Sequence, residues 1–151
     1  MRKVRRILSF ACLVLLPLLV FASCKPNTLK PPEEGGKFSF STDLTKRSYT
    51  YKEGETMRFT VAVTNNSGED LQIMTNGYMP DADLYSVDDT ILRVRPAIGI
   101  EQSFKADEKI EKTFEFALDQ KGKYILAIFY SFSVDGVPYS GKFEDISVRV
   151  R

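Results

Sequence analysis

Apolar and polar positions alternate along most of the chain after residue 37. In four runs every second residue is apolar, so each run presents an apolar face and an opposite, mostly polar face when extended. The apolar positions are Phe38 and Phe40; Phe59, Val61 and Val63; Phe114, Phe116 and Leu118; and Ile146, Val148 and Val150. Helical periodicity is nearly absent here. The pattern therefore predicts strands whose sheets have one solvated side and pack face to face in two layers.

Turn-forming residues separate the predicted strands, and Asp135-Gly136 is the sharpest of these signals. Asp-Gly readily supplies the positive φ angles of a type I′ turn, which predicts pairing between residues 123–134 and 137–150. The first of these segments is apolar on both faces, as is typical of a central strand. The predicted fold class is all-β: an immunoglobulin-like antiparallel β-sandwich of seven or eight strands over residues 37–151.

Tyr124 has a candidate structural role at the start of that central strand. It follows Gly122-Lys123, and in immunoglobulin-like sandwiches a tyrosine at the start of the penultimate strand often bonds its hydroxyl back to the corner backbone. A plain core aromatic is the alternative that the residues leave open.

The N-terminus has the layout of a secretory signal peptide, with a cationic start at residues 1–6 and an apolar run over residues 7–22. The run is shorter than the roughly 20 residues of an untilted membrane-spanning helix. It ends in Ala22-Ser23-Cys24, which resembles the lipobox of bacterial lipoprotein precursors. That resemblance implies a signal peptide at 1–23 and a lipid on Cys24. The composition of residues 25–36, rich in proline and glycine, predicts that the rest of the segment 24–36 is a flexible tether. Ordinary secretion, with Cys24 as a free thiol, is the alternative.

The lipobox resemblance also implies a place in the cell and a class of partner. The lipid would anchor the domain to a bacterial membrane on its non-cytoplasmic side, where we expect an envelope protein as partner. Without residues 1–23 the chain keeps 17 Lys and Arg against 20 Asp and Glu, with no basic block. Nucleic-acid binding needs clustered cations, so it is not expected.

A second resemblance begins at the predicted second strand. Residues 51–55 (YKEGE), followed by residues 59–67 (FTVAVTNNS), resemble the opening of the intracellular proteinase inhibitor (BsuPI) family of small immunoglobulin-like β domains. Residues 83–93 are similar to the family's next hairpin, and Gly122-Lys123-Tyr124 to its late Gly-x-Tyr. The similarity covers most of residues 49–132, although the tryptophan usual in the hairpin is absent. It implies an immunoglobulin-like fold and, as an activity, inhibition of a protease.

The composition excludes most familiar enzyme chemistry. The chain has no histidine, which removes Ser-His, Cys-His and His-ligated zinc sites, and we expect no cofactor. The densest acidic group comprises Asp81, Asp83, Asp88 and Asp89, and it does not match a calcium loop because Leu92 stands where glutamate should close the site. We expect a solvated hairpin there and no metal.

One segment has a composition suited to a protein contact. Tyr78, Met79 and Pro80 follow Gly77 between two predicted strands, where tyrosine and methionine at a loop tip are typical of partner surfaces. The alternative is that Tyr78 or Met79 folds back onto the sandwich edge.

Two function hypotheses follow from the sequence as a whole: a non-enzymatic, membrane-anchored binding or scaffold module, and, as the alternative, a proteinase inhibitor of the BsuPI type. An enzyme is a distant third.

Overall fold

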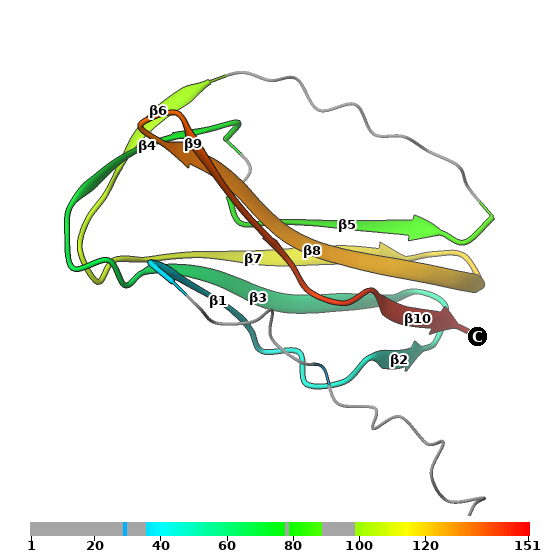
Figure 1. Cartoon of the computed structure of the whole chain (residues 1–151). Helices are drawn as coiled ribbons and strands as arrows, with labels where there is room; N and C mark the ends of the chain where they lie inside the picture. The colour runs from blue at the N-terminus through cyan, green and yellow to red at the C-terminus, as the bar shows by residue number, and fades with distance from the viewer. Residues whose placement is uncertain (1–28, 30–35, 78, 89–98) are drawn as a thin grey trace, which may run out of the picture.

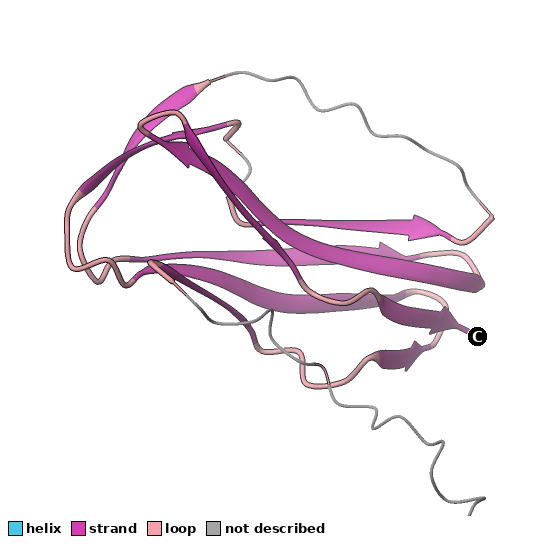
Figure 2. Ribbon diagram, in the orientation of Figure 1, coloured by secondary structure: helices cyan, strands magenta, loops and turns pink. Residues whose placement is uncertain are grey.

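The computed structural model describes residues 29, 36–77, 79–88 and 99–151, which form ten strands and no helix (Figures 1 and 2). Within these ranges no helical segment has the length and apolar character needed to cross a membrane. The strands are β1 (Phe38–Thr42), β2 (Ser48–Tyr51), β3 (Glu55–Asn65), β4 (Leu71–Thr75), β5 (Asp81–Ser86), β6 (Ile100–Phe104), β7 (Lys109–Leu118), β8 (Gly122–Val134), β9 (Val137–Lys142) and β10 (Ile146–Val150).

The strands form two sheets, as the alternation predicted. The smaller sheet has the order β1-β3-β7; the larger has the order β2-β10-β8-β4-β6, with β5 and β9 also paired to β8. The fold is an immunoglobulin-like β-sandwich, but it has more strands than the predicted seven or eight. It is also not wholly antiparallel, because β2 pairs parallel with β10. After β1 the chain leaves the smaller sheet and joins the edge of the larger one, where it runs in the direction of β10 (Figure 1).

The core lies between the two sheets and contains the apolar faces predicted from the sequence. Of the four alternating runs, all apolar members are buried except Phe116, which packs partly exposed against the core. Phe38 on β1 joins the layers, since its ring lies 6.0 Å from that of Phe104 and 4.7 Å from that of Phe132, both in the larger sheet. Aromatic contacts at these distances add to the stabilisation from apolar burial.

The hairpin predicted at Asp135-Gly136 is confirmed. Both residues have positive φ (51° and 78°), as a type I′ turn requires, and Val134 lies opposite Val137 in the β8–β9 pairing. The second arm pairs with β8 in two parts, first as β9 and then as β10.

A β-bulge separates those two parts. The Phe143 N–H donates to the Ile128 carbonyl at 3.0 Å, whereas the next ladder pair joins Ile146 to Leu126. Two residues, 144 and 145, therefore stand opposite Ala127 alone, and the register shifts by one residue. The shift keeps Phe143 and Ile146 both in the core, although an odd number of steps separates them.

Tyr124 has the corner role predicted for it. Its hydroxyl donates to the Gln120 carbonyl at 2.8 Å, four residues back along the chain. A Cβ on Gly122 would lie 3.3 Å from the Tyr124 ring, tighter than most such contacts, so the glycine gives the ring room to lie against the backbone. The side chain is half-buried, so it packs on the margin of the core.

Asn65 is a buried polar residue that joins the ends of the two sheets. It ends β3 and has no exposed surface, and its side-chain amide donates to the carbonyls of Glu69, Phe104 and Lys105 at 2.9–3.0 Å. Its side-chain oxygen accepts bonds from the backbone N–H and the hydroxyl of Ser67. The side chain thus holds the β3–β4 turn against the end of β6.

Leu29 lies inside the segment expected to be a tether. It is only 8% exposed, packs in the core cluster, and donates its N–H to the Thr45 carbonyl at 2.9 Å. Contact between the chain and the sandwich therefore begins before residue 37, on the loop that leads into β2.

We predict that Asn65→Ala lowers the free energy of unfolding by about 3 kcal/mol, because it removes the five hydrogen bonds that join the β3–β4 turn to the end of β6. Asn66→Ala is the matched control, since Asn66 is exposed, and it should change stability by less than about 0.5 kcal/mol. Urea unfolding of both variants measures this. Equal effects of the two changes would contradict the role assigned to Asn65.

We predict that Tyr124→Phe lowers stability by about 1 kcal/mol, because it removes the hydroxyl bond to Gln120 and keeps the ring. Tyr139→Phe is the control: Tyr139 packs on Phe38 and Phe132, and no described residue accepts a hydrogen bond from its hydroxyl. Thermal or urea unfolding of both variants tests the prediction, which is wrong if Tyr139→Phe costs as much.

Candidate binding site

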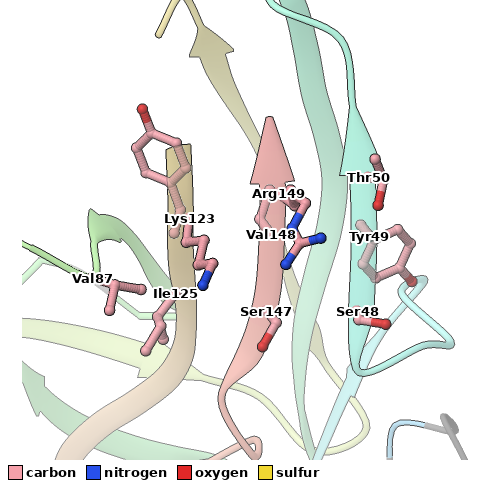
Figure 3. A pocket seen from close by; sticks show the side chains of 10 residues that line it. Ser48, Tyr49, Thr50, Val87, Lys123, Ile125, Ser147, Val148 and Arg149 are labelled. Carbon is pink, nitrogen blue, oxygen red and sulfur yellow. The ribbon is translucent and has the colours of Figure 1, made fainter. Parts of the chain in front are cut away.

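A groove crosses the outer face of the larger sheet over β2, β10 and β8 (Figure 3). Its volume is about 430 Å³. Ten residues line it: Ser48, Tyr49, Thr50, Val87, Lys123, Tyr124, Ile125, Ser147, Val148 and Arg149. Because alternate residues of β10 are buried between the sheets, Ser147 and Arg149 project to the outside.

Strand register places these outward residues in two rows. Lys123, Arg149 and Thr50 are successive register partners on β8, β10 and β2. The adjacent row, two residues along each strand, holds Ile125, Ser147 and Ser48 in the same way. Register partners in neighbouring strands have side chains on the same face, so the rows form one surface of cations, hydroxyls and one aliphatic side chain.

Lys123 and Arg149 form a like-charged pair at the centre of this surface. They lie directly opposite each other in the antiparallel β8–β10 pairing, and both are exposed. Figure 3 shows both side chains on the same side of the sheet. Neither forms an ion pair with another residue of the described ranges. Like charges directly opposite each other are destabilising, so the pair costs stability.

The two acidic side chains that directly precede β10 are engaged elsewhere. Glu144 and Asp145, the two bulge residues before β10, pair with Arg47 at 2.5 Å and Lys142 at 2.8 Å. Of the ten residues that line the groove, none is Asp or Glu. Burial, with smaller contributions from Tyr49 and Glu55, raises the pKa of Tyr51 on β2 above its ordinary value of 10.0, so that phenol carries no negative charge at neutral pH. The ten lining residues therefore carry a net positive charge, from Lys123 and Arg149.

The lining has the donors needed to bind an anion. Two cations and the hydroxyls of Ser147 and Thr50 can all donate hydrogen bonds to an oxyanion. A carboxylate or histidine base, which would activate either hydroxyl as a nucleophile, is missing from the lining residues.

The residues predicted as sites lie away from this groove. Cys24 and Tyr78 are outside the described residues. Met79 is only 8% exposed and belongs to the core cluster, and Pro80 is buried beside it. The exposure expected of Met79 and Pro80 is thus wrong, because the apolar segment before β5 packs into the sandwich edge. That Met79 and Pro80 contact a partner stays a prediction, but their expected exposure no longer supports it.

The acidic segment also differs from the solvated hairpin that was expected. Asp81 is buried at the start of β5, where its Oδ1 accepts a hydrogen bond from the Ala82 N–H at 2.8 Å. Asp89 lies outside the described residues. Within the described ranges, no three acidic, cysteine or histidine side chains gather closely enough to hold a metal ion.

Sequence reasoning did not single out Lys123 or Arg149. It predicted only that the face opposite Ile146, Val148 and Val150 is mostly polar and that residue 123 begins the hairpin. Bringing Lys123 opposite Arg149 requires the bulge register, which an unbroken hairpin does not have.

Comparisons with known proteins show only likeness of fold. No family model and no curated protein matches the chain. Among solved structures, the PapD-like domain 7 of human CEP192 is similar at a TM-score of 0.47 with 15% identity, over 84% of this chain and 92% of that domain. The ApaA-assigned protein of Bordetella pertussis is similar at 0.45 with 13% identity, over 81% and 97%. A family 123 glycoside hydrolase from Clostridium perfringens is similar at 0.48 with 10% identity, over 76% of this chain but 27% of the hydrolase.

We predict that Lys123→Glu raises the free energy of unfolding by about 0.5–1 kcal/mol, because it turns a like-charged cross-strand pair into an opposite-charged one. The gain should shrink at high salt, where exposed charges are screened. Urea unfolding at low and high salt measures both effects.

Two controls separate the pair from a general charge effect. Lys37→Glu makes the same change of charge on the smaller-sheet side, just before β1, and should give no gain. In an Arg149→Gln background, Lys123→Glu should also lose its advantage. A gain that persists without Arg149 would show that the pair is not the cause.

Proposed function

We propose that this protein is a non-enzymatic binding module of the bacterial cell envelope, anchored to a membrane through a lipid on Cys24 on the non-cytoplasmic side. The observation that carries the binding role is the groove over β2, β10 and β8, in which the like-charged Lys123–Arg149 pair is exposed on the face of the sheet. The anchor rests on the cationic start, the apolar run and the Ala22-Ser23-Cys24 sequence.

Binding without turnover fits the side chains that are available. The chain has no histidine, and the groove offers donors of hydrogen bonds but no carboxylate. Such a lining can hold an anionic group, while general acid–base catalysis would require a group poised to accept a proton. This favours recognition over reaction.

The packing of Leu29 supports a domain held close to the membrane. Leu29 is bonded to Thr45 next to β2 and lies five positions after Cys24. Five residues span at most about 18 Å even when fully extended. A lipid on Cys24 would therefore hold the β2 side of the sandwich near the bilayer surface.

We predict that Cys24→Ser abolishes stable membrane attachment, because the thiol that carries the lipid is lost. The control is Cys12→Ser, which removes the chain's other cysteine from within the apolar run and should leave attachment intact. Mass spectrometry of the purified mature protein should find an acylated residue 24 at its N-terminus. An unmodified Cys24, or a mature chain that keeps residues 1–23, would remove the anchored form of the proposal.

A protease panel separates this function from the alternative. A binding module should leave every protease unaffected, while inhibition of a protease at stoichiometric protein would favour the BsuPI-type inhibitor instead. The variant Lys123→Gln/Arg149→Gln adds a control. In a pull-down from the native envelope it should retain less of the bound partners than the unchanged protein does. In the protease panel it should, like the unchanged protein, inhibit none of the proteases.

A further inference from the structure

We propose that the groove is a site for a phosphate group, bound by Lys123 and Arg149 with hydrogen bonds from Ser147 and Thr50. This proposal names the chemical class of the ligand for the proposed function. It rests on that function in one respect, namely that the groove binds its ligand without catalysing a reaction. The residues come from three adjacent strands, and their positions follow from strand register (Figure 3).

Charge is the first reason. Lys123 and Arg149 lie opposite each other with no carboxylate among the lining residues, and the acids of the neighbouring bulge are paired with Arg47 and Lys142. An anion between the two cations would add two attractive contacts that offset their repulsion. None of the ten lining side chains is such an anion, and a bound ligand would supply one.

Donor geometry is the second reason, and it favours phosphate over carboxylate. The planar guanidinium of Arg149 can donate two parallel bonds to two oxygens, and the Lys123 ammonium acts as a point charge beside it. Thr50 neighbours Arg149 in the same row, and Ser147 stands two residues away on the same face of β10. Two cations and two hydroxyls exceed what the two oxygens of a carboxylate can use well, whereas a phosphate has three or four acceptor oxygens and a charge up to −2.

The size of the groove indicates a phosphate ester rather than the free ion. A volume of about 430 Å³ leaves room beyond the phosphate itself for the group that it carries. Val87 and Ile125 lie at the β8 side of the groove and provide apolar contact for that group (Figure 3). A soluble phosphate ester and a phospholipid headgroup share this chemistry.

The test uses the mature protein as it is purified from the membrane, in a detergent with an uncharged sugar headgroup. Sodium phosphate is titrated at constant ionic strength against sodium chloride, and backbone amide signals are followed by NMR. We expect saturable shifts at residues 123, 147 and 149 with phosphate and not with chloride. The variant Lys123→Gln/Arg149→Gln should weaken the apparent affinity by about tenfold or more, because both charge-assisted contacts are lost.

A matched control removes two positive charges elsewhere. Arg58→Gln/Lys105→Gln changes one cation on β3 and one just after β6, and it should bind phosphate as the unchanged protein does. If chloride gives the same shifts, or if the shifts survive in the Lys123→Gln/Arg149→Gln variant, the site is wrong. Thermal unfolding of all variants shows whether each is folded.

A second arm distinguishes the two sources of phosphate. The same protein in nanodiscs that contain phosphatidylglycerol should show the shifted signals before any phosphate is added if a headgroup occupies the groove. If a soluble ester is the ligand, the signals should stay at their positions in detergent until glycerol phosphate is added. Absence of shifts in both cases would overturn the proposal. Failure of Cys24 acylation is detected separately by mass spectrometry and leaves the phosphate titration interpretable.

Discussion

Strand β8 is the element on which the larger sheet depends. Its thirteen residues pair with β10 and β9 along one edge and with β5 and β4 along the other, while β2 and β6 are attached through β10 and β4. Because β8 has hydrogen bonds on both edges, the backbone positions from which its outward side chains project are fixed. Lys123 is near its start, where Tyr124 is bonded to the Gln120 carbonyl. The groove thus rests on one side on a strand that is hydrogen-bonded along both edges.

The bulge after β9 determines which residues face each other across the groove. An unbroken two-residue hairpin would pair Lys123 with Val148 and leave Arg149 opposite Gly122. The extra residue moves Arg149 opposite Lys123, and it does so because Phe143 and Ile146 must both reach the core. In a β-sheet a shift of one residue reverses the face of every side chain that follows. Core packing and the charged pair therefore depend on the same local irregularity.

The sandwich could be predicted from the sequence because its signals are local. Alternation in β1, β3, β7 and β10 marks the core faces, and Asp135-Gly136 marks its hairpin without any tertiary information. The sequence also contains a signal of the bulge, since the apolar positions change from odd numbers at Tyr139 and Phe143 to even numbers at Ile146 and Val148. That signal does not fix where the extra residue sits, because the position is decided by pairing with β8.

Features that depend on contacts distant in sequence could not be predicted in this way. Asn65 has the composition of a turn residue, and only the approach of the β6 carbonyls makes it a buried junction. From the sequence alone, Met79 has the composition of an exposed loop residue, but packing at the sandwich edge buries it. The parallel edge strand β2 is short, and its place beside β10 follows from the crossing between sheets rather than from its own residues.

The same reasoning explains why a destabilising pair can stand at the centre of a candidate site. Val148 between Ser147 and Arg149 is almost fully buried, so the backbone of β10 cannot move to separate Arg149 from Lys123 without disturbing the core. The two side chains can relieve their repulsion only by extending into solvent or by sharing an anion. Since the backbone is already fixed, binding an anion orders two side chains and little else, which keeps the entropic cost of binding low. Edge strand β2 brings Thr50 to the site with hydrogen bonds on one side only, so the side of the groove nearest the expected membrane anchor is also the side most able to adjust to its ligand.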